Sequence, residues 1–208
     1  MAKTLLQLHE GVSPDHYDLA IKKNVFQKFW HWRRFNELSK ITTPVNGKIV
    51  DIGCHSGLLT QKIVNWTGAD KIYGLDISPK AIEKAKKRIK NGYFVVGDAQ
   101  KLPFKNNFFE AAFCIEMIEH VDFPQKVLAQ IYRVVKKNGY AVILIPTDNL
   151  LFKVIWFIWN LRYPVWKHVH VQSFNGTLLE DMAEGLGFKV SLVKTFSLGM
   201  LKLVKLKK

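Results

Sequence analysis

The sequence is poor in cysteine and in acidic residues. Its two cysteines, Cys54 and Cys114, stand far apart in apolar surroundings, and neither belongs to a CxxC or CxxH pattern. This spacing argues against a disulfide scaffold and against a zinc finger. Asp and Glu number 17 against 31 Lys and Arg among 208 residues, which gives a formal net charge of +14. Such a charge favours nucleic acid, anionic lipid or an acidic substrate, unless it is only a lysine-rich solvated surface.

A long hydrophobic run is missing as well. The longest apolar stretch, residues 150–161, contains Lys153 and Asn160 and is too short to span a bilayer. The first residues of the chain have no uninterrupted apolar core followed by a small-residue cleavage site. We therefore expect a cytoplasmic protein without a transmembrane segment. Peripheral contact with a membrane stays open, and so does the oligomeric state.

What the sequence does contain is ordinary globular material, with 48% hydrophobic and 23% charged residues, enough for one domain. From residue 48 to residue 145, short apolar runs alternate with segments of helical period. Continuous apolar strands between helices are typical of a parallel sheet that is covered on both faces. The sequence therefore predicts a doubly wound α/β fold, with strands over residues 48–53, 71–76, 93–96, 110–115 and 140–145.

Local signals place the ends of two helices. Ser78 and Pro79 predict the start of one helix, because serine caps free N–H groups and proline suits the first turn. Asn138 and Gly139 predict a left-handed cap that ends a second helix, over residues 125–136. Outside the repeat, the pattern predicts a helix before the first strand and a two-stranded tail, over residues 17–40 and 188–208.

Three carboxylates follow the ends of successive predicted strands: Asp51, Asp76 and Asp98. Ligands of an open α/β sheet bind beyond the carboxyl ends of its strands. Asp76, 23 residues beyond Gly53, is placed to accept both hydroxyls of a ribose. Asp98 is placed to accept a hydrogen bond from an exocyclic amine such as that of adenine. The competing interpretation is that each Asp merely caps a helix.

A glycine turn, Gly53 to Gly57, lies between the first two of these carboxylates. Its glycines permit close approach of the backbone to a ligand. Their spacing is GxxxG, whereas dinucleotide-binding turns read GxGxxG. Asp51 also directs a negative charge to the place of a pyrophosphate, which it would repel. The turn therefore favours a cationic ligand that carries an amino group.

The chain resembles the class I S-adenosylmethionine-dependent methyltransferases, of the type 11-like kind. Their first three motifs are similar to residues 50–57, 74–78 and 97–99, and a later motif is similar to residues 128–147. The resemblance extends over about residues 15 to 195. It implies a Rossmann-like sheet of seven strands with an antiparallel last strand and helices on both faces.

The resemblance also implies roles within the cofactor site. Gly53 and Gly57 would line the methionine moiety, Asp76 would hold the ribose, and Asp98 with Ala99 would meet the adenine. The full set expected to bind S-adenosylmethionine is Asp51, Gly53, Cys54, Gly57, Asp76, Ile77, Asp98, Ala99 and Ile115. His55 departs from the family, which usually has glycine there, so that a side chain narrows the site or contacts the substrate. A basic residue, Arg33 or Arg34, would reach the cofactor carboxylate, unless both are merely solvated.

Glu116, Glu119 and His120 follow the fourth predicted strand at offsets i, i+3 and i+4. On a helix these three side chains would share one face and provide ligands for Mg²⁺ or Mn²⁺. A metal there would lower the pKa of a substrate hydroxyl. This run resembles O-methyltransferases of ubiquinone biosynthesis and small-RNA 3′-terminal 2′-O-methyltransferases. Without a metal, the three are polar residues at a helix start, and His120 is the best general base.

Aromatic and basic residues gather in residues 150–171, which the sequence predicts to cover the site. His168 and His170 are two residues apart in this segment, so alternation would place both side chains on one face. There they would contact the substrate or serve as a base. An acid-free aromatic segment suits a lipophilic acceptor or a membrane surface, or else a packed lid that excludes water.

We therefore expect one methyltransferase domain with four parts: an N-terminal helical cap, a cofactor-binding core, an aromatic substrate lid, and a C-terminal helix with strands (residues 1–45, 46–147, 148–178 and 179–208). The expected reaction moves a methyl group to a small, lipophilic acceptor, with O-methylation favoured. One alternative is an RNA 2′-O-methyltransferase that uses the positive charge. The other is a non-catalytic protein that binds S-adenosylmethionine.

Overall fold

The structure is a computed structural model that describes residues 25–162 and 172–208. A seven-stranded sheet forms its centre, with the strand order β3-β2-β1-β4-β5-β7-β6. The first five strands are mutually parallel, and β7 is antiparallel to both of its neighbours. The predicted doubly wound fold and the antiparallel last strand are thus confirmed. The strands are β1 (Lys48–Ile52), β2 (Lys71–Asp76), β3 (Tyr93–Val96), β4 (Phe109–Ile115), β5 (Val135–Pro146), β6 (Lys189–Phe196) and β7 (Leu201–Lys207).

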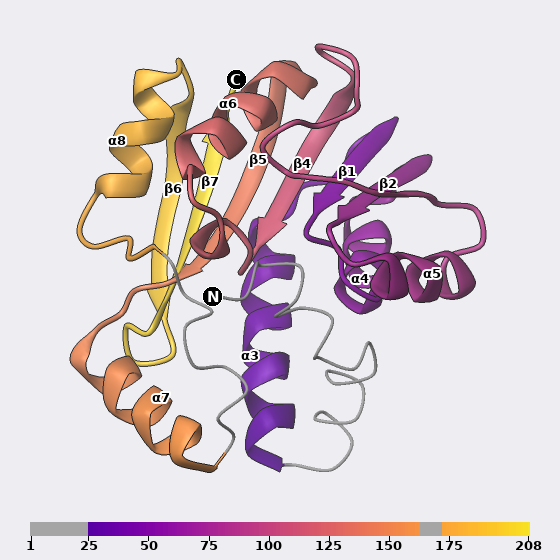
Figure 1. The fold of residues 1–208 in the computed structure, drawn as a ribbon. Helices are drawn as coiled ribbons and strands as arrows, with labels where there is room; N and C mark the ends of the chain where they lie inside the picture. The colour runs from indigo at the N-terminus through magenta and orange to yellow at the C-terminus, as the bar shows by residue number, and fades with distance from the viewer. Residues whose placement is uncertain (1–24, 163–171) are drawn as a thin grey trace.

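Helices cover both faces of this sheet (Figure 1). Their bounds are α3 (Val25–Ile41), α4 (Leu58–Thr67), α5 (Pro79–Arg88), η1 (Ile118–His120), α6 (Pro124–Val134), α7 (Leu150–Arg162) and α8 (Leu178–Gly185). Side chains of a strand alternate between faces, so Val50 of β1 packs in one core with α6 and α8. Its neighbour Ile49 packs in the other core, with α3 and α4. Strand β1 therefore contributes to two cores, one on each face of the sheet.

Two predicted boundaries are confirmed in atomic detail. Ser78 caps α5, because its hydroxyl accepts a hydrogen bond from the Ala81 N–H at 3.3 Å, and Pro79 opens the helix. The tail forms the expected two strands, β6 and β7, joined by a turn at Ser197 and Leu198, both with positive φ. The part of the predicted N-terminal helix that precedes residue 25 lies outside the described residues.

The predicted helix cap at Asn138 and Gly139 is wrong. Helix α6 ends at Val134, and β5 begins at the next residue, Val135. Val135 pairs with Phe109 of β4, and the register then shifts, so Asn138 and Gly139 lie in an irregularity of the strand. Asn138 does adopt the expected left-handed φ of 67°. Helix α6 ends earlier than predicted because Val135, a β-branched residue, pairs with β4 in the sheet instead of extending the helix.

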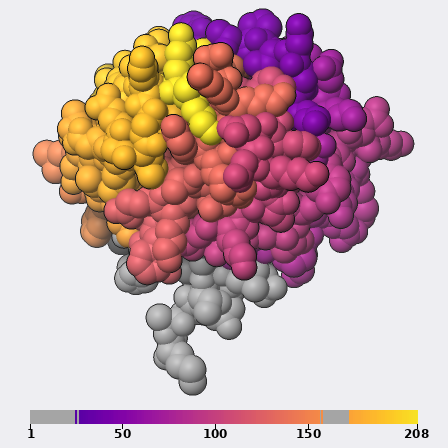
Figure 2. Space-filling model, turned by 90° about the horizontal axis from the view of Figure 1, so that it is seen from above, coloured from indigo at the N-terminus to yellow at the C-terminus, as the bar shows by residue number. Residues whose placement is uncertain are grey.

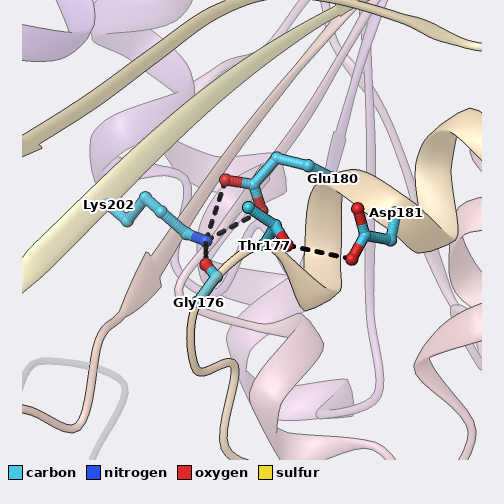
Figure 3. Close-up of polar contacts among 5 residues, drawn as sticks. All are labelled: Gly176, Thr177, Glu180, Asp181 and Lys202. Carbon is cyan, nitrogen blue, oxygen red and sulfur yellow. Dashed lines mark hydrogen bonds and ion pairs between the residues drawn. The ribbon is translucent and has the colours of Figure 1, made fainter.

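An ion pair inside the molecule links the tail to α8 (Figure 3). Lys202 Nζ lies 2.9 and 2.8 Å from the two carboxylate oxygens of Glu180, and it also donates to the Gly176 carbonyl oxygen at 2.7 Å. Both side chains are buried. Because Gly176 precedes α8, this contact holds the start of α8 against β7.

Seen from the end at which the parallel strands begin, the C-terminal residues (yellow) lie at the surface (Figure 2).

This ion pair generates a stability prediction. Replacement of Lys202 by Met leaves Glu180 buried without a cation, and we expect a loss of about 3–5 kcal/mol in the free energy of unfolding. The double variant Lys202→Met/Glu180→Leu removes the unpaired charge and is expected to regain most of that loss. Urea unfolding followed by circular dichroism measures both. The control is Lys87→Met, which breaks the exposed pair with Glu83 and changes little; an equally small effect of Lys202→Met contradicts the prediction.

Candidate functional site

The principal candidate site is a pocket at the carboxyl ends of β1, β2, β3 and β4. The fold brings these ends together because the four strands are parallel neighbours. Every residue predicted to bind the cofactor lines this pocket except Gly57. Side chains of α3 close another side of it. The lining residues from the sequence prediction are Asp51, Gly53, Cys54, Asp76, Ile77, Asp98, Ala99 and Ile115.

The turn after β1 is fixed by backbone hydrogen bonds to β2. The N–H groups of Gly53 and Cys54 both donate to the Leu75 carbonyl oxygen, at 2.7 and 3.0 Å. Gly53 has a φ of 80°, and a Cβ on it would lie 2.4 Å from Met117 Cγ. Glycine is therefore required here both by backbone conformation and by space. Gly57, with a φ of 75°, begins α4, and a Cβ on it would meet Ala85 at 3.3 Å.

His55 stands in this turn with a φ of 46°, in the left-handed region that glycine adopts most easily. Its N–H donates to Asp76 Oδ2 at 2.8 Å, which offsets the strain of that conformation. The side chain of His55 contributes to the pocket lining, as the sequence analysis expected of a residue larger than glycine.

Asp76 organises the site at the end of β2. Besides the bond from His55, it accepts the Ser78 N–H on its other oxygen, Oδ1, at 2.9 Å. A carboxylate oxygen can accept two hydrogen bonds, and each oxygen of Asp76 accepts one from the His55 or Ser78 N–H. Each therefore retains one acceptor position for a ligand hydroxyl. The carboxylate is buried yet lines the pocket. This is an arrangement that can receive the two neighbouring hydroxyls of a ribose.

Asp51 is buried beneath the turn. Its Oδ2 accepts a hydrogen bond from the Thr60 hydroxyl at 2.5 Å. Burial raises the pKa of the Asp51 carboxyl to about 7; the Thr60 hydrogen bond opposes this rise and the nearby Asp76 charge adds to it. A cation placed in the pocket would favour the charged form of Asp51. Asp98, in contrast, is exposed at the pocket rim, where its Oδ1 accepts the Gln100 N–H at 2.8 Å.

The predicted metal triad does not assemble. Glu116 has a φ of 50° and η1 contains only Ile118 to His120, so Glu116, Glu119 and His120 do not share a helical face. Glu116 is engaged in an ion pair with Arg34. Burial, together with the charge of Glu116, raises the pKa of Glu119 well above its usual range. Within residues 25–162 and 172–208, no three His, Cys, Asp or Glu side chains are placed to hold a metal ion.

His120 and Glu119 have different surroundings despite being adjacent. His120 lines the pocket, whereas Glu119 lies behind it, fully buried, with its Oε1 3.9 Å from His120 Nε2. Of the three residues, His120 and Glu116 are therefore accessible to a substrate in the pocket, and Glu119 is not. The other predicted catalytic residues, His168 and His170, lie outside the described residues.

Helix α3 supplies the cation of the pocket. Arg34 is buried and lines the pocket, and the alternative, Arg33, does not. Arg34 Nε has no hydrogen-bond partner within the described residues. Sequence reasoning missed His31 and Phe35, which also line the pocket. The available signals were the position of this helix before the first strand and the spacing of His31, which lies three residues before Arg34 and four before Phe35 and so shares a helix face with each.

A family model described as a methyltransferase domain matches residues 50–143. That segment runs from β1 into β5 and includes the pocket residues that the sequence predicted at the strand ends and in the glycine turn. It leaves out α3, which provides Arg34, and α7.

No helix of the described residues is long and apolar enough to cross a membrane.

Two curated proteins are similar to the chain. The ubiquinone/menaquinone biosynthesis C-methyltransferase of Desulfotalea psychrophila is 28% identical over 202 residues, which cover 88% of this chain and 82% of that protein. The demethylmenaquinone methyltransferase of Thermotoga maritima is 32% identical over 143 residues, 68% of this chain and 61% of that protein. Among solved structures, a Pyrococcus horikoshii protein has a TM-score of 0.71 with 20% identity, covering 96% of this chain and 97% of that chain.

The buried Asp51 carboxyl generates a prediction about pH. Because its pKa in the folded protein is raised from 3.8 to about 7, the native state binds its proton more tightly than the unfolded chain. Unfolding free energy is therefore lost as pH rises from about 4 to about 7, by roughly 4 kcal/mol from this group.

Asp51→Asn keeps an acceptor for Thr60 and removes the titration, so we expect the variant to exceed the parent in stability at pH 8 but not at pH 4. Urea unfolding at both pH values measures this difference. The matched control is Asp98→Asn, at the exposed rim. Identical pH slopes for Asp51→Asn and the parent contradict the assigned pKa.

Proposed function

We propose that this chain, which carries a class I S-adenosylmethionine-dependent methyltransferase domain, transfers the methyl group to a ring carbon of a lipophilic, quinol-type acceptor. The support for the acceptor class comes from the two relatives, one named a C-methyltransferase of ubiquinone and menaquinone biosynthesis and the other a demethylmenaquinone methyltransferase. Neither name supports the O-methylation that the sequence analysis favoured. We therefore place the new bond on carbon.

The observation that carries the proposal is the convergence of three carboxylates and a glycine turn on one pocket. Asp76 would accept the ribose hydroxyls with the acceptor positions left on its two oxygens. Asp98 and Ala99 would meet the adenine, with Ile77 against its face. These residue types fit a ligand that combines a nucleoside with positive charge, because the Asp51 carboxylate beneath the turn would repel a pyrophosphate.

The α-carboxylate of S-adenosylmethionine has a fitting partner in Arg34. The buried Nε of Arg34 has no hydrogen-bond partner within the described residues, although the guanidinium is paired with Glu116. A buried donor of this kind is costly unless a ligand accepts its hydrogen bond. Arg34 thus has a donor to spare for a carboxylate, and Glu116 holds the guanidinium in place.

When bound, S-adenosylmethionine supplies an electrophilic methyl group on its sulfonium sulfur. The protein then has to place the acceptor carbon in line and exclude water. We assign to His120 the removal of the proton from a ring hydroxyl, which raises the electron density of the neighbouring carbon. The methyl group would leave sulfur as it bonds to that carbon; the hydrogen on the attacked carbon would leave as a proton to solvent, and His120 would return its proton to the ring oxygen.

The cofactor assignment predicts the effect of Asp76→Ala. Loss of both carboxylate acceptors is expected to weaken S-adenosylmethionine binding at least about tenfold, since a charge-assisted hydrogen bond contributes more than 1.4 kcal/mol. Isothermal titration calorimetry measures the affinity. Asp70→Ala, at an exposed position before β2, is the matched control and should bind like the parent.

Because Asp76 also supports the turn, a thermal unfolding curve must show that Asp76→Ala is folded at the titration temperature. The milder Asp76→Asn retains one acceptor oxygen and is expected to fall between the alanine variant and the parent. Unchanged affinity in a folded alanine variant contradicts the ribose assignment.

The assignment of His120 predicts a selective loss of turnover. His120→Gln is expected to lower kcat with a demethylated quinol by about a hundredfold or more, which is typical for loss of a general base. S-adenosylmethionine affinity should change less than about twofold, because His120 is not assigned to the cofactor. Product analysis by NMR locates the methyl group on carbon or oxygen. An unchanged kcat removes His120 as the base, and an O-methyl product overturns the carbon assignment.

A further inference from the structure

Helix α7 presents an exposed apolar surface. Leu150 and Phe157 are 79% and 65% exposed, and Leu151, Val154 and Ile155 are exposed as well. At about 100° per residue these five side chains occupy one continuous arc of roughly half the helix circumference. Phe152 points the other way and is buried against the protein. The arc is therefore a single face and not scattered hydrophobic residues.

The turn between β6 and β7 extends this surface. Asn149, directly before α7, donates from its side-chain amide to the Leu198 carbonyl oxygen at 3.2 Å. The Leu198 side chain is 81% exposed. Asn149 also accepts the Phe152 N–H at 2.8 Å, so the same residue caps α7 and ties it to the turn. We call Leu198 and the five exposed residues of α7 the apolar face.

A second exposed stripe belongs to the helix that lines the pocket. Val25, Phe29 and Trp32 of α3 are exposed and lie on one side of that helix by their spacing of four and three residues. Arg34 lies on the opposite side, in the pocket. Figure 1 shows α7 and the N-terminal end of α3 beyond the carboxyl ends of the central strands, the same end of the sheet as the site.

The charged residues of α7, and those of the described part of α3 up to Arg34, are all basic. Helix α7 contains no acidic residue, and Lys153 is exposed at the edge of the arc. The described part of α3 before Arg34 likewise has no acidic residue, and Lys28 is exposed there. With a net charge of +14, two copies of the chain repel each other, whereas an anionic surface attracts either one. The chemistry of the face is thus complementary to anionic lipid.

We propose that the apolar face docks on the surface of an anionic phospholipid bilayer, with α7 lying in the plane of the interface. The apolar arc would enter the boundary of the acyl chains while Lys153 stays among the headgroups. Helix α7 has 13 residues, too few to span the hydrocarbon core, which suits a helix that lies on the membrane. Docking in this way brings the carboxyl end of the sheet to the membrane.

This geometry explains how the site would meet its acceptor, and that part rests on the proposed function. A quinol with a long isoprenoid tail stays in the bilayer, so an enzyme that methylates it must work at the membrane surface. The docking itself does not depend on the acceptor. It is therefore tested with vesicles that contain no quinol, and cofactor binding is tested without vesicles.

The experiment is co-sedimentation of the full chain with vesicles of equal parts phosphatidylcholine and phosphatidylglycerol, and with vesicles of phosphatidylcholine alone. We expect binding to the anionic vesicles, at least about tenfold weaker binding to the neutral ones, and weakening by salt. Leu150→Gln/Phe157→Gln is expected to reduce binding to the anionic vesicles by about tenfold or more. Both positions are exposed, so the variant should keep its thermal unfolding midpoint and its S-adenosylmethionine affinity.

A matched pair of single variants separates a specific face from general hydrophobicity. Val154 in α7 and Val193 in β6 are both 47% exposed, and each is changed to Gln. We expect Val154→Gln to weaken vesicle binding about threefold and Val193→Gln to leave it unchanged. Equal effects overturn the proposal, as does a parent chain that fails to bind anionic vesicles. A dimer in analytical ultracentrifugation that Leu150→Gln/Phe157→Gln dissociates would assign the face to a second copy, and would also overturn it.

Discussion

The site depends on one local constraint, the attachment of the turn after β1 to the end of β2. The Leu75 carbonyl oxygen accepts the N–H groups of Gly53 and Cys54, and Asp76 accepts that of His55. These bonds are possible because β1 and β2 are parallel neighbours that end at the same edge. They hold the backbone open to a ligand, and they aim the Asp76 carboxylate into the same space. Without these hydrogen bonds, the turn after β1 would not be held beside the end of β2, and the pocket residues of the two segments would not lie together.

The pocket concentrates acidic groups, and the molecule accommodates them in three different ways. Asp51 is shielded and held by Thr60, with a raised pKa. Glu119 lies in the interior, where burial raises the pKa of its carboxyl, and Glu116 pairs with Arg34 of α3, a helix outside the segment that the family model matches. Burial of this kind costs stability, and carboxyl groups whose pKa is perturbed by burial and by neighbouring charges are often found at functional sites. The charged pocket residues thus lie at the carboxyl end of the sheet, and the apolar face lies at the same end of the molecule.

Sequence reasoning located pocket residues correctly where their location follows from a position at the end of a strand. Asp51, Asp76 and Asp98 could be found in this way, since parallel strands deliver their ends to one place. It failed where geometry depended on a change of backbone direction. The i, i+3, i+4 spacing of Glu116, Glu119 and His120 assumed a helix, but Glu116 takes a left-handed φ directly after β4. Arg34 was one of two equal candidates, because a single helix does not reveal which side will face the sheet.

The amino-acid sequence by itself determined the class of fold and the order of its elements, since hydrophobic period and capping residues act over a few neighbouring positions. It also determined which strand ends carry carboxylates and where glycine must stand. Only the tertiary structure decided which carboxylates are buried, which one meets Arg34, and where α6 gives way to β5. Those outcomes depend on contacts between residues far apart in the chain, such as Val135 with Phe109, and their energies arise only when both partners are in place.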